Sequence, residues 1–465
     1  MSARVAVVGG GITGLTAART LRTAADPAAV TLVEATGRLG GKVHTQTLDG
    51  LTVDTGADAF LARTPEGVRL CRELGLARRL VAPATTEVSV RWDGRLHPLP
   101  QGLVLGAPTR LTPLLRSSLL STAGAARAAL DLVLPRVLDP DHETVADLIG
   151  YRFGTQVLER LVDPLMAGIY AGDPHRLGAA DATPPLAEAA RQSRSLLRGL
   201  RRRPQEPAPL FLTLEGGMGH LVDALAAAPE MEVRLADPVR LVEATDGGYR
   251  LRLASGDVLD VDGVILAVPA FAAASLLREL APDAAAALRQ IAYASAATVV
   301  LVYPAGSGRL RGSGLLVPRA ERTLVKAASW VSSKWPERAP GDQMVVRASI
   351  GRHGDRDALE RSDRELADVA HRELSEVIRL GSRPDAWLVT RWERSLPQYL
   401  VGHRDLVRRI RGGLAHLPGV TVAGAAYDGI GITACVRQGQ EAAWQVSAVL
   451  HLTPTGPASR RPRAS

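Results

Sequence analysis

The sequence has few cysteines, few aromatic residues and no clustered histidines. Its 465 residues include two cysteines, Cys71 and Cys435, and neither lies in a paired motif. The ten histidines are scattered, with no pair at the spacing of metal ligands. These absences argue against a disulfide scaffold and against a metal site, and they fit a reducing cytoplasm. Aromatic residues make up only 4% of the chain, so we expect a core of leucine, valine and alanine.

Long apolar segments and clustered charge are also scarce. The longest apolar run, residues 291–303, is shorter than the roughly 20 residues of a transmembrane helix, and it predicts a buried strand. The first strand is expected to begin at Arg4 or Val5, which leaves no room for a signal peptide. The formal net charge is +8, but apart from residues 201–203 the basic residues are spread along the chain. This distribution argues against nucleic-acid binding and favours a basic cleft for an anionic ligand.

The N-terminal segment predicts a dinucleotide-binding α/β fold. A strand over residues 3–8 precedes a glycine-rich turn, a helix over 12–22 and a second strand over 30–34. The length of the chain fits two or three domains. Further strands are expected over 210–214, 233–235, 264–268 and 420–423, with a hairpin over 249–261 and a last helix over about 433–452.

The glycine turn has the spacing of a cofactor-phosphate site. Gly9 permits the tight turn, Gly11 lets the backbone approach a pyrophosphate, and Gly14 lets helix and strand pack closely. The phosphates are then expected at the helix N-terminus, where free N–H groups favour anions. Glu34 follows Gly14 at the distance expected of a carboxylate that binds ribose hydroxyls.

The next segment favours FAD over NAD. Residues 34–42, Glu-Ala-Thr-Gly-Arg-Leu-Gly-Gly-Lys, match the E-x-x-x-R-x-G-G pattern of amine oxidase-like flavoproteins. Gly40 and Gly41 let the chain pass close to the cofactor, and Arg38 can pair with its phosphates.

Two later segments are candidates for the flavin ring. In residues 54–58, Gly56 and Ala57 are small enough to face an isoalloxazine, and Asp58 either faces the ring or caps a helix. Residues 424–432 lead from a strand into the last helix, whose start can stabilise the negative charge of a reduced flavin. Cys435 lies one turn inside that helix. We interpret it as a packing residue and expect non-covalent FAD.

The sequence resembles the FAD-dependent porphyrinogen oxidases of haem biosynthesis. These are the protoporphyrinogen oxidases and the coproporphyrinogen III oxidases of Gram-positive bacteria. The resemblance covers about residues 3–450 and is carried by residues 7–15, 54–60, 96–100, 168–174, 396–399, 402–403 and 427–432. The segments at 168–174 and 396–403 distinguish this family from monoamine oxidases and phytoene desaturases, which share only the flavin motifs.

The resemblance implies a fold and a reaction. The fold is α/β, a Rossmann-like FAD-binding domain with an inserted substrate domain and a helical lobe. The expected segments are FAD-binding at 1–85, 206–275 and 413–453, substrate and helical lobe at 86–205, substrate domain at 276–412, and a disordered tail at 454–465. The reaction removes six electrons from a porphyrinogen in three two-electron steps, with dioxygen as oxidant and hydrogen peroxide as product. The next haem-pathway enzyme is a candidate for transient contact.

The motifs and the resemblance together give a set of site residues. The expected cofactor-binding residues are Gly9, Gly10, Gly11, Ile12, Thr13, Gly14, Glu34, Ala35, Arg38, Gly41, Lys42, Gly56, Ala57, Asp58, Ala59, Val239, Gly429, Ile430, Gly431 and Ile432. The resemblance places Gly168, Ile169 and Tyr170 near the ring plane, with Ile169 shaping the pocket. Tyr170 is either an orienting donor or a packed tyrosine. Substrate propionates are expected to meet Arg63, His403 and Arg404, each of which has the alternative of a solvated surface charge.

Several alternatives stay open. Coproporphyrinogen III carries four propionates and protoporphyrinogen IX two, so a basic cleft favours the copro form. An amine or carotenoid-type flavin oxidase would share the cofactor motifs, and a non-catalytic haem-binding scaffold would bind no flavin. Residues 114–134, interrupted by Arg116, Arg127 and Asp131, predict an amphipathic packed helix, with loose membrane association of a cytoplasmic protein left open.

Overall fold

A five-stranded parallel sheet forms around the N-terminal strand. Its order is β12 (Glu232–Arg234), β2 (Ala29–Val33), β1 (Arg4–Val8), β16 (Gly263–Leu266) and β22 (Val420–Val422), and each pairing is parallel. The strands therefore come from three separated stretches of chain. Side chains of β1 point alternately into two apolar clusters, one on each face. A parallel sheet covered on both faces explains why its strands are nearly continuous apolar runs.

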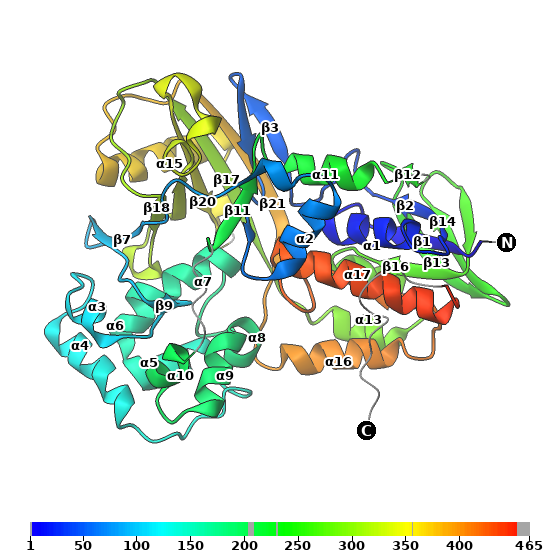
Figure 1. Cartoon of the computed structure of the whole chain (residues 1–465), viewed down its shortest axis with the longest axis horizontal. Helices are drawn as coiled ribbons and strands as arrows, with labels where there is room; N and C mark the ends of the chain where they lie inside the picture. The colour runs from blue at the N-terminus through cyan, green and yellow to red at the C-terminus, as the bar shows by residue number, and fades with distance from the viewer. Residues whose placement is uncertain (1, 203–208, 229–230, 356, 453–465) are drawn as a thin grey trace.

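The computed structural model describes residues 2–202, 209–228, 231–355 and 357–452. The tail expected to be disordered, 454–465, lies outside these residues. On one face of the parallel sheet, α1 (Ile12–Arg22) lies beside α17 (Ile432–Val449), blue beside red in Figure 1. The two backbones approach so closely that a Cβ on Gly439 would lie 2.5 Å from the Thr13 carbonyl oxygen. The predicted first helix, 12–22, is confirmed.

The opposite face of the parallel sheet is covered by a small sheet and several helices. The small sheet consists of β13 (Val239–Thr245), β14 (Gly248–Leu253) and β15 (Val258–Val261), and it includes the predicted hairpin. The helices of this face are α12 (Ala270–Leu276), α13 (Pro282–Leu288) and α16 (His403–Gly413).

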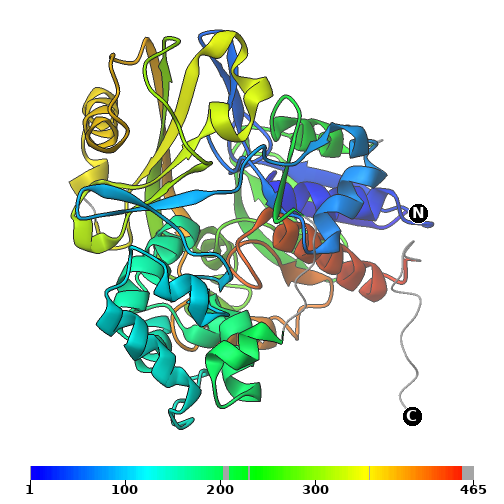
Figure 2. The ribbon, with the colours of Figure 1, turned by 60° about the vertical axis from the view of Figure 1, so that its left-hand side comes forward.

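A second, seven-stranded sheet forms the other large layer. Its order is β21 (Ala386–Pro397), β17 (Tyr293–Tyr303), β20 (Met344–Ile350), β19 (Val325–Trp330), β18 (Gly314–Leu316), β7 (Val88–Trp92) and β8 (Arg95–Pro98). The apolar run at 291–303 contains β17, an inner strand of this sheet, and the predicted buried strand is confirmed. Helix α15 (Asp363–Ile378) packs on one face of this sheet over an apolar cluster. Figure 2 shows this sheet, the parallel sheet and a helical lobe as three parts around the centre of the molecule.

The helical lobe contains α3 (Leu111–Leu115), α4 (Thr122–Ala129), α5 (Val145–Phe153), α7 (Asp163–Tyr170), α9 (Pro184–Gln192) and α10 (Leu196–Arg201). The prediction of one helix over 114–134 is wrong. Helix α3 ends at Leu115, and α4 begins anew after Ser121, whose hydroxyl accepts a hydrogen bond from the Gly124 N–H. Serine at this position favours a helix N-cap over helix continuation. Among the described residues, no helix is long and apolar enough to cross a membrane.

Candidate functional site

The glycine turn after β1 forms an open cradle at the start of α1. A Cβ on Gly14 would lie 1.9 Å from the Gly9 carbonyl oxygen, and one on Gly9 would lie 2.7 Å from that of Ala267. Both glycines are therefore required by close packing. A Cβ on Gly11 would meet nothing within 4 Å, so this side of the turn is free for a ligand. Gly11 is also the N-cap of α1 without a side-chain cap, which leaves helix N–H groups for an anion.

Glu34 lies directly beside this cradle. It follows the last residue of β2, and its Oε2 accepts a hydrogen bond of 2.7 Å from the Gly10 N–H. Its Oε1 accepts from the N–H and the hydroxyl of Thr36 at 2.9 and 2.8 Å. These bonds hold the carboxylate at the carboxyl end of the strand, where a dinucleotide fold binds ribose.

A second glycine turn closes against the first. The Gly40 N–H donates to the Gly10 carbonyl oxygen at 2.8 Å, and a Cβ on Gly41 would lie 3.2 Å from Gly11 Cα. Arg38 donates to the Gly41 carbonyl oxygen at 2.8 Å. Desolvation lowers the pKa of Arg38, and the nearby Glu34 carboxylate opposes that shift. The guanidinium remains charged beside the cradle.

Lys42 follows the second glycine turn, and Cys435 lies in the first turn of α17. The Lys42 side chain is exposed, and desolvation lowers its pKa against the opposing effect of Cys435. Cys435 is half-buried, and burial raises the pKa of its thiol against the opposing effect of a hydrogen bond with Thr13. The thiol is therefore protonated at neutral pH and is a poor nucleophile.

The segment expected at the flavin ring is anchored by the seven-stranded sheet. Asp58 pairs with Arg347 at 3.0 Å and with Lys334 at 3.3 Å. These cations outweigh the opposing effect of burial and hold the pKa of Asp58 well below its usual range. Arg347 also donates to the Gly56 carbonyl oxygen at 2.9 Å. Asp58 forms a partly buried ion-pair group and caps no described helix, so the helix-cap alternative is wrong, and its place beside the flavin ring stays a prediction.

Asp54 forms a second anchor of the same kind. It pairs with Arg338 at 2.5 Å, and it accepts a hydrogen bond from the Met218 N–H at 3.1 Å, at the start of α11 (Gly219–Ala226). The indole N–H of Trp392 donates to the Thr55 carbonyl oxygen at 3.1 Å. Sequence reasoning missed the four anchoring side chains because each is isolated and roughly 280 to 340 positions away in the chain. They are Lys334, Arg338, Arg347 and Trp392.

The other expected cofactor residues lie in several separate places. Residues 429–432 form the turn into α17, whose N-cap Gly431 has no side-chain cap. Val239 begins β13, where it pairs with Leu253 and packs against the core below the parallel sheet. Ala35 is exposed just beyond Glu34, and Ala57 and Ala59 follow Gly56 as partly buried residues.

The substrate-side residues of α7 differ in their availability. Gly168 is exposed and Ile169 is half-buried, and a Cβ on Gly168 would lie 3.5 Å from Leu316 on the seven-stranded sheet. The Tyr170 hydroxyl donates to the Ala182 carbonyl oxygen at 3.0 Å and is buried. This bond makes Tyr170 a packed tyrosine of the helical lobe rather than a free donor.

The three expected propionate partners differ in their surroundings. Arg63 is exposed before α2 (Pro65–Glu73). His403 is 5% exposed, and burial lowers its pKa to about 4, so it is neutral and supplies no cation. The Arg404 guanidinium donates to the Ala180 carbonyl oxygen and borders a cavity of about 490 Å³ beside the helical lobe. The expectation of a cationic His403 is therefore corrected.

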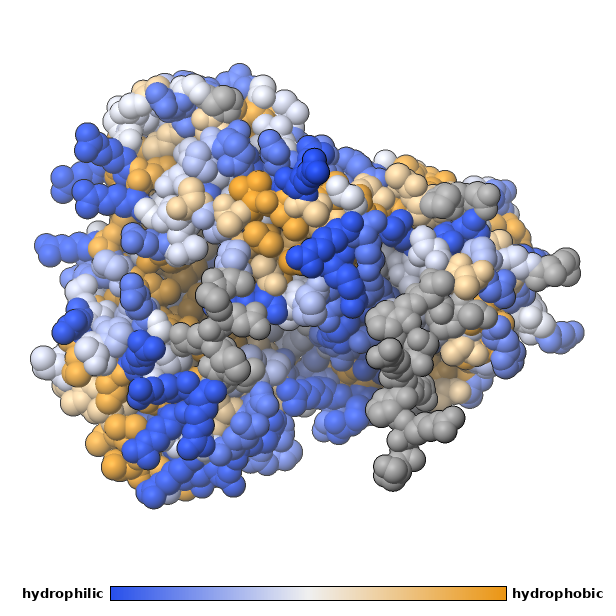
Figure 3. All heavy atoms as spheres, in the orientation of Figure 1, coloured by the Kyte–Doolittle hydropathy of each residue, from blue (hydrophilic) through white to orange (hydrophobic). Residues whose placement is uncertain are grey.

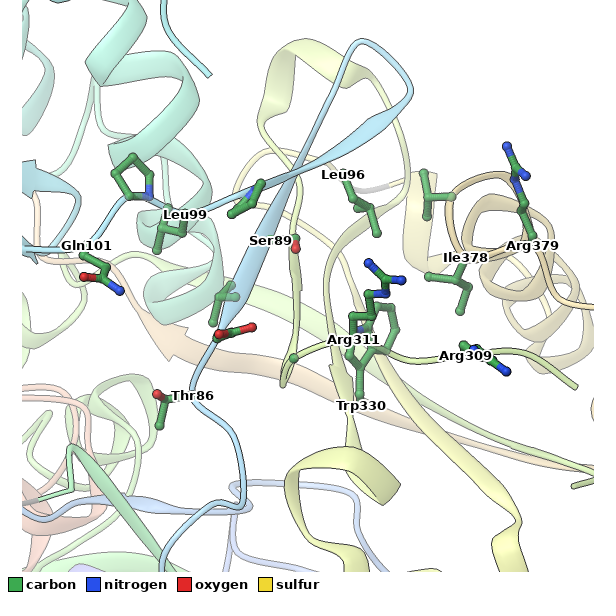
Figure 4. Close-up of a pocket in the computed structure, with 16 residues that line it drawn as sticks. Thr86, Ser89, Leu96, Leu99, Gln101, Arg309, Arg311, Trp330, Ile378 and Arg379 are labelled. Carbon is green, nitrogen blue, oxygen red and sulfur yellow. The ribbon is translucent and has the colours of Figure 1, made fainter. Parts of the chain in front are cut away.

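A further cavity of about 860 Å³ lies apart from these residues, between β7, β8 and the end of α15 (Figure 4). It is lined by Leu96, Trp330, Arg309, Arg311 and Arg379 among others, and none of the expected cofactor or substrate residues borders it. Among the described residues, no group of histidine, cysteine, aspartate and glutamate side chains could hold a metal ion.

Comparisons with known proteins identify the family of this chain. The chain matches the family of flavin-containing amine oxidoreductases over residues 12–447. It is 35% identical over 455 residues to coproporphyrinogen III oxidase of Bacillus subtilis (strain 168), covering 94% of this chain and 96% of that protein. It is 39% identical over 435 residues to coproporphyrinogen III oxidase of Mycobacterium leprae (strain TN), covering 92% and 95%.

A solved structure is similar over the same length. A protein of Exiguobacterium sp. 255-15, assigned as a protoporphyrinogen oxidase, superposes with a TM-score of 0.86 at 32% identity, covering 97% of this chain and 99% of that one. The expected fold class, that of the amine oxidase-like flavoproteins, is confirmed. Because the family match and the relatives extend over nearly its whole length, the chain belongs to the flavin-containing amine oxidoreductases.

Proposed function

We propose that this protein is an oxygen-dependent FAD oxidase that converts coproporphyrinogen III to coproporphyrin III in haem biosynthesis. The observation that carries the proposal is the 35–39% identity, over more than 90% of the chain, to proteins named coproporphyrinogen III oxidase. The six-electron oxidation balances as three two-electron steps, in which three molecules of dioxygen become three of hydrogen peroxide. When bound, the flavin supplies the redox chemistry, and the protein supplies binding, orientation and electrostatics.

The glycine turn after β1 and the second glycine turn, at Gly40 and Gly41, would hold the ADP half of FAD. The free face at Gly11 and the uncapped N–H groups of α1 suit the pyrophosphate. The Glu34 carboxylate would accept hydrogen bonds from the ribose hydroxyls in place of its present hydrogen bonds from Gly10 and Thr36. Arg38 has its guanidinium beside the cradle, within reach of a phosphate.

The flavin half would lie between the two segments expected at the flavin ring, residues 54–58 and 424–432. Its proposed neighbours are Ile12, Thr13, Gly41, Lys42, Gly56, Ala57, Asp58, Ala59, Gly429, Ile430, Gly431 and Ile432, with Val239 and Ala35 toward the adenosine end. The uncapped start of α17 offers N–H groups to negative charge on the ring. The protonated Cys435 thiol supports non-covalent binding.

The substrate would enter between the seven-stranded sheet and the helical lobe. Gly168 and Ile169 present accessible surface there, so they are proposed to shape the pocket. Arg63 and Arg404 are the proposed propionate partners, since both residues are exposed. Four propionates gain more than two from a basic cleft, which supports the copro form as the preferred substrate.

The division of the chain follows from the same proposal. Segments 1–85, 206–275 and 413–453 would form the cofactor domain, because they contribute all five strands of the parallel sheet. Segments 86–205 and 276–412 would bind the substrate.

We place the protein in the cytoplasm, with transient contact to the next enzyme of the pathway. The helical lobe carries exposed apolar side chains among charged ones, which leaves loose membrane contact as part of the proposal (Figure 3).

Anaerobic reduction of the bound flavin tests the function directly. Purified protein is mixed with coproporphyrinogen III or with protoporphyrinogen IX, and flavin absorbance is followed. We expect faster bleaching with the copro form and, in air, a higher kcat/KM from porphyrin fluorescence. Equal or higher efficiency with protoporphyrinogen IX would reverse the preference. Reduction by a polyamine alone would favour an amine oxidase, and a protein without flavin absorbance would favour a haem-binding scaffold.

A further inference from the structure

The Tyr399 hydroxyl bridges the loop that leads into α17. It donates to the Ala425 carbonyl oxygen at 2.8 Å and accepts from the Gly429 N–H at 2.8 Å. A phenol has one proton, so the donation to Ala425 turns an oxygen lone pair toward Gly429. Gly429 has a φ of 117°, a conformation that a side chain would disfavour, and it lies two residues before the α17 N-cap. One buried side chain therefore fixes both ends of this loop.

The Tyr399 ring packs against two other aromatic rings. It stacks on His403, with ring centroids 4.0 Å apart and an interplanar angle of 14°. It also contacts the Tyr170 ring, with centroids 5.7 Å apart in a tilted arrangement. The His403 Nε2 lies 3.3 Å from the Tyr427 carbonyl oxygen, and a neutral imidazole can donate there. His403 thus adds a third attachment to the same loop.

The same short segment also holds the substrate-side helix. The neighbouring Gln398 donates its side-chain amide to the Tyr170 carbonyl oxygen at 2.8 Å, at the C-terminal end of α7. The Tyr399 carbonyl oxygen accepts from the Gly178 N–H at 2.9 Å. Residues 398–399 therefore contact the helix that carries Gly168 and the loop that precedes α17.

We propose that Tyr399 is a positioning residue that sets the start of α17 against the flavin and ties it to the substrate-side helix α7. The inference rests on the proposed function, because it requires a flavin at the N-terminus of α17. Uncapped helix N–H groups stabilise negative charge only over the first turn, so a displaced loop would weaken their effect on a reduced flavin. The bound flavin should then be harder to reduce.

Tyr399→Phe tests this role because it keeps the stacked ring and removes only the hydroxyl. We expect the reduction equilibrium of the bound flavin to shift three- to tenfold toward the oxidised form, about 15 to 30 mV for a two-electron couple. The potential is measured by equilibration with a reference dye in the absence of porphyrinogen. Tyr249→Phe is the matched control, since its buried hydroxyl also donates to a backbone carbonyl, that of Pro418, outside this loop.

The outcomes are distinct. A lower potential in Tyr399→Phe, with the control at the wild-type value, supports positioning. Equal potentials in all three proteins, with a loss of thermal stability shared by the two variants, would reduce Tyr399 to a structural role and leave the oxidase proposal intact. Absence of flavin from the wild-type protein would overturn both proposals. If Tyr399→Phe does not fold, His403→Phe keeps an aromatic stack and removes the Tyr427 contact, and the same direction of shift is expected. An unchanged potential there would overturn the inference.

Discussion

Asp58 and Arg347 come from different layers of the molecule and meet at 3.0 Å, directly behind the glycine expected to face the flavin ring. Asp58 belongs to the segment after β4 (Leu51–Asp54), and Arg347 lies in the middle of β20. Arg347 binds the Asp58 carboxylate and the Gly56 carbonyl oxygen at once. The segment at residues 54–58, expected beside the flavin, is therefore positioned by the seven-stranded sheet of the proposed substrate domain.

Replacing Arg347 with Met should loosen this segment. The variant leaves the partly buried Asp58 carboxylate with one direct ion-pair partner, Lys334. We expect this to lower the free energy of unfolding by about 3 kcal/mol, the lower end for a broken buried pair. The cations depress the pKa of Asp58 in the folded state, so their stabilising effect is present above the unfolded pKa and is lost as the pH falls below it. Urea unfolding at pH 7 and pH 3 should show a smaller pH dependence in the variant. An Arg391→Met control removes a surface pair with Asp363. An equal loss of unfolding free energy in both variants would contradict the anchoring role of Arg347.

Glu34→Ala should weaken FAD binding ten- to a hundredfold. Hydrogen bonds to a charged group contribute roughly 1.5–3 kcal/mol, which corresponds to that range of affinity. Flavin fluorescence during titration of apo-protein gives the dissociation constant. Glu232→Ala is the control, because Glu232 is also a carboxylate on the parallel sheet but bonds to Thr31 and Arg234. Unchanged affinity in Glu34→Ala would remove Glu34 from the ribose site.

Acid precipitation should release the flavin. Burial keeps the Cys435 thiol protonated, and no attachment motif surrounds it, so the supernatant should be yellow and the pellet colourless. A yellow pellet that becomes colourless in Cys435→Ala would demonstrate a thioether bond instead.

Lys326 should give the protein a distinctive pH dependence. It is 1% exposed, and its ammonium donates to the Gly351 carbonyl oxygen. Desolvation, assisted by the positive charge of Arg352, lowers its pKa to about 7. The unfolded state then binds one proton more than the folded state between about pH 7 and the ordinary lysine value. Stability attributable to this group should therefore rise with pH over that interval, by at most about 1.4 kcal/mol per pH unit.

The variant Lys326→Met isolates this effect. We expect it to be more stable than wild type at pH 7, with a difference that shrinks as the pH rises to 10. Denaturant midpoints measured at both pH values give the comparison, and contributions of other groups cancel in the difference. A stability difference independent of pH would show that Lys326 keeps its ordinary pKa.

The sequence alone was sufficient for the local parts of the cofactor site. The helix over 12–22, the strands on either side of it and the position of Glu34 follow from glycine spacing and from apolar periodicity. These signals are local, because a turn that brings a backbone close to a phosphate needs glycine at fixed positions. The resemblance motifs at 168–174 and 396–403 likewise identified α7 and Tyr399 as notable before their contacts were known.

Only the tertiary structure determined which side chains support those segments. Arg347, Arg338 and Trp392 reach the cofactor side from a separate sheet, and no local pattern marks an isolated arginine as the partner of a distant aspartate. Burial likewise decided the charge of His403, which the sequence left as a candidate propionate partner or surface charge and the fold keeps neutral. Desolvation and long-range pairing depend on what surrounds a residue in space, so they are settled only when the three parts of the chain pack together.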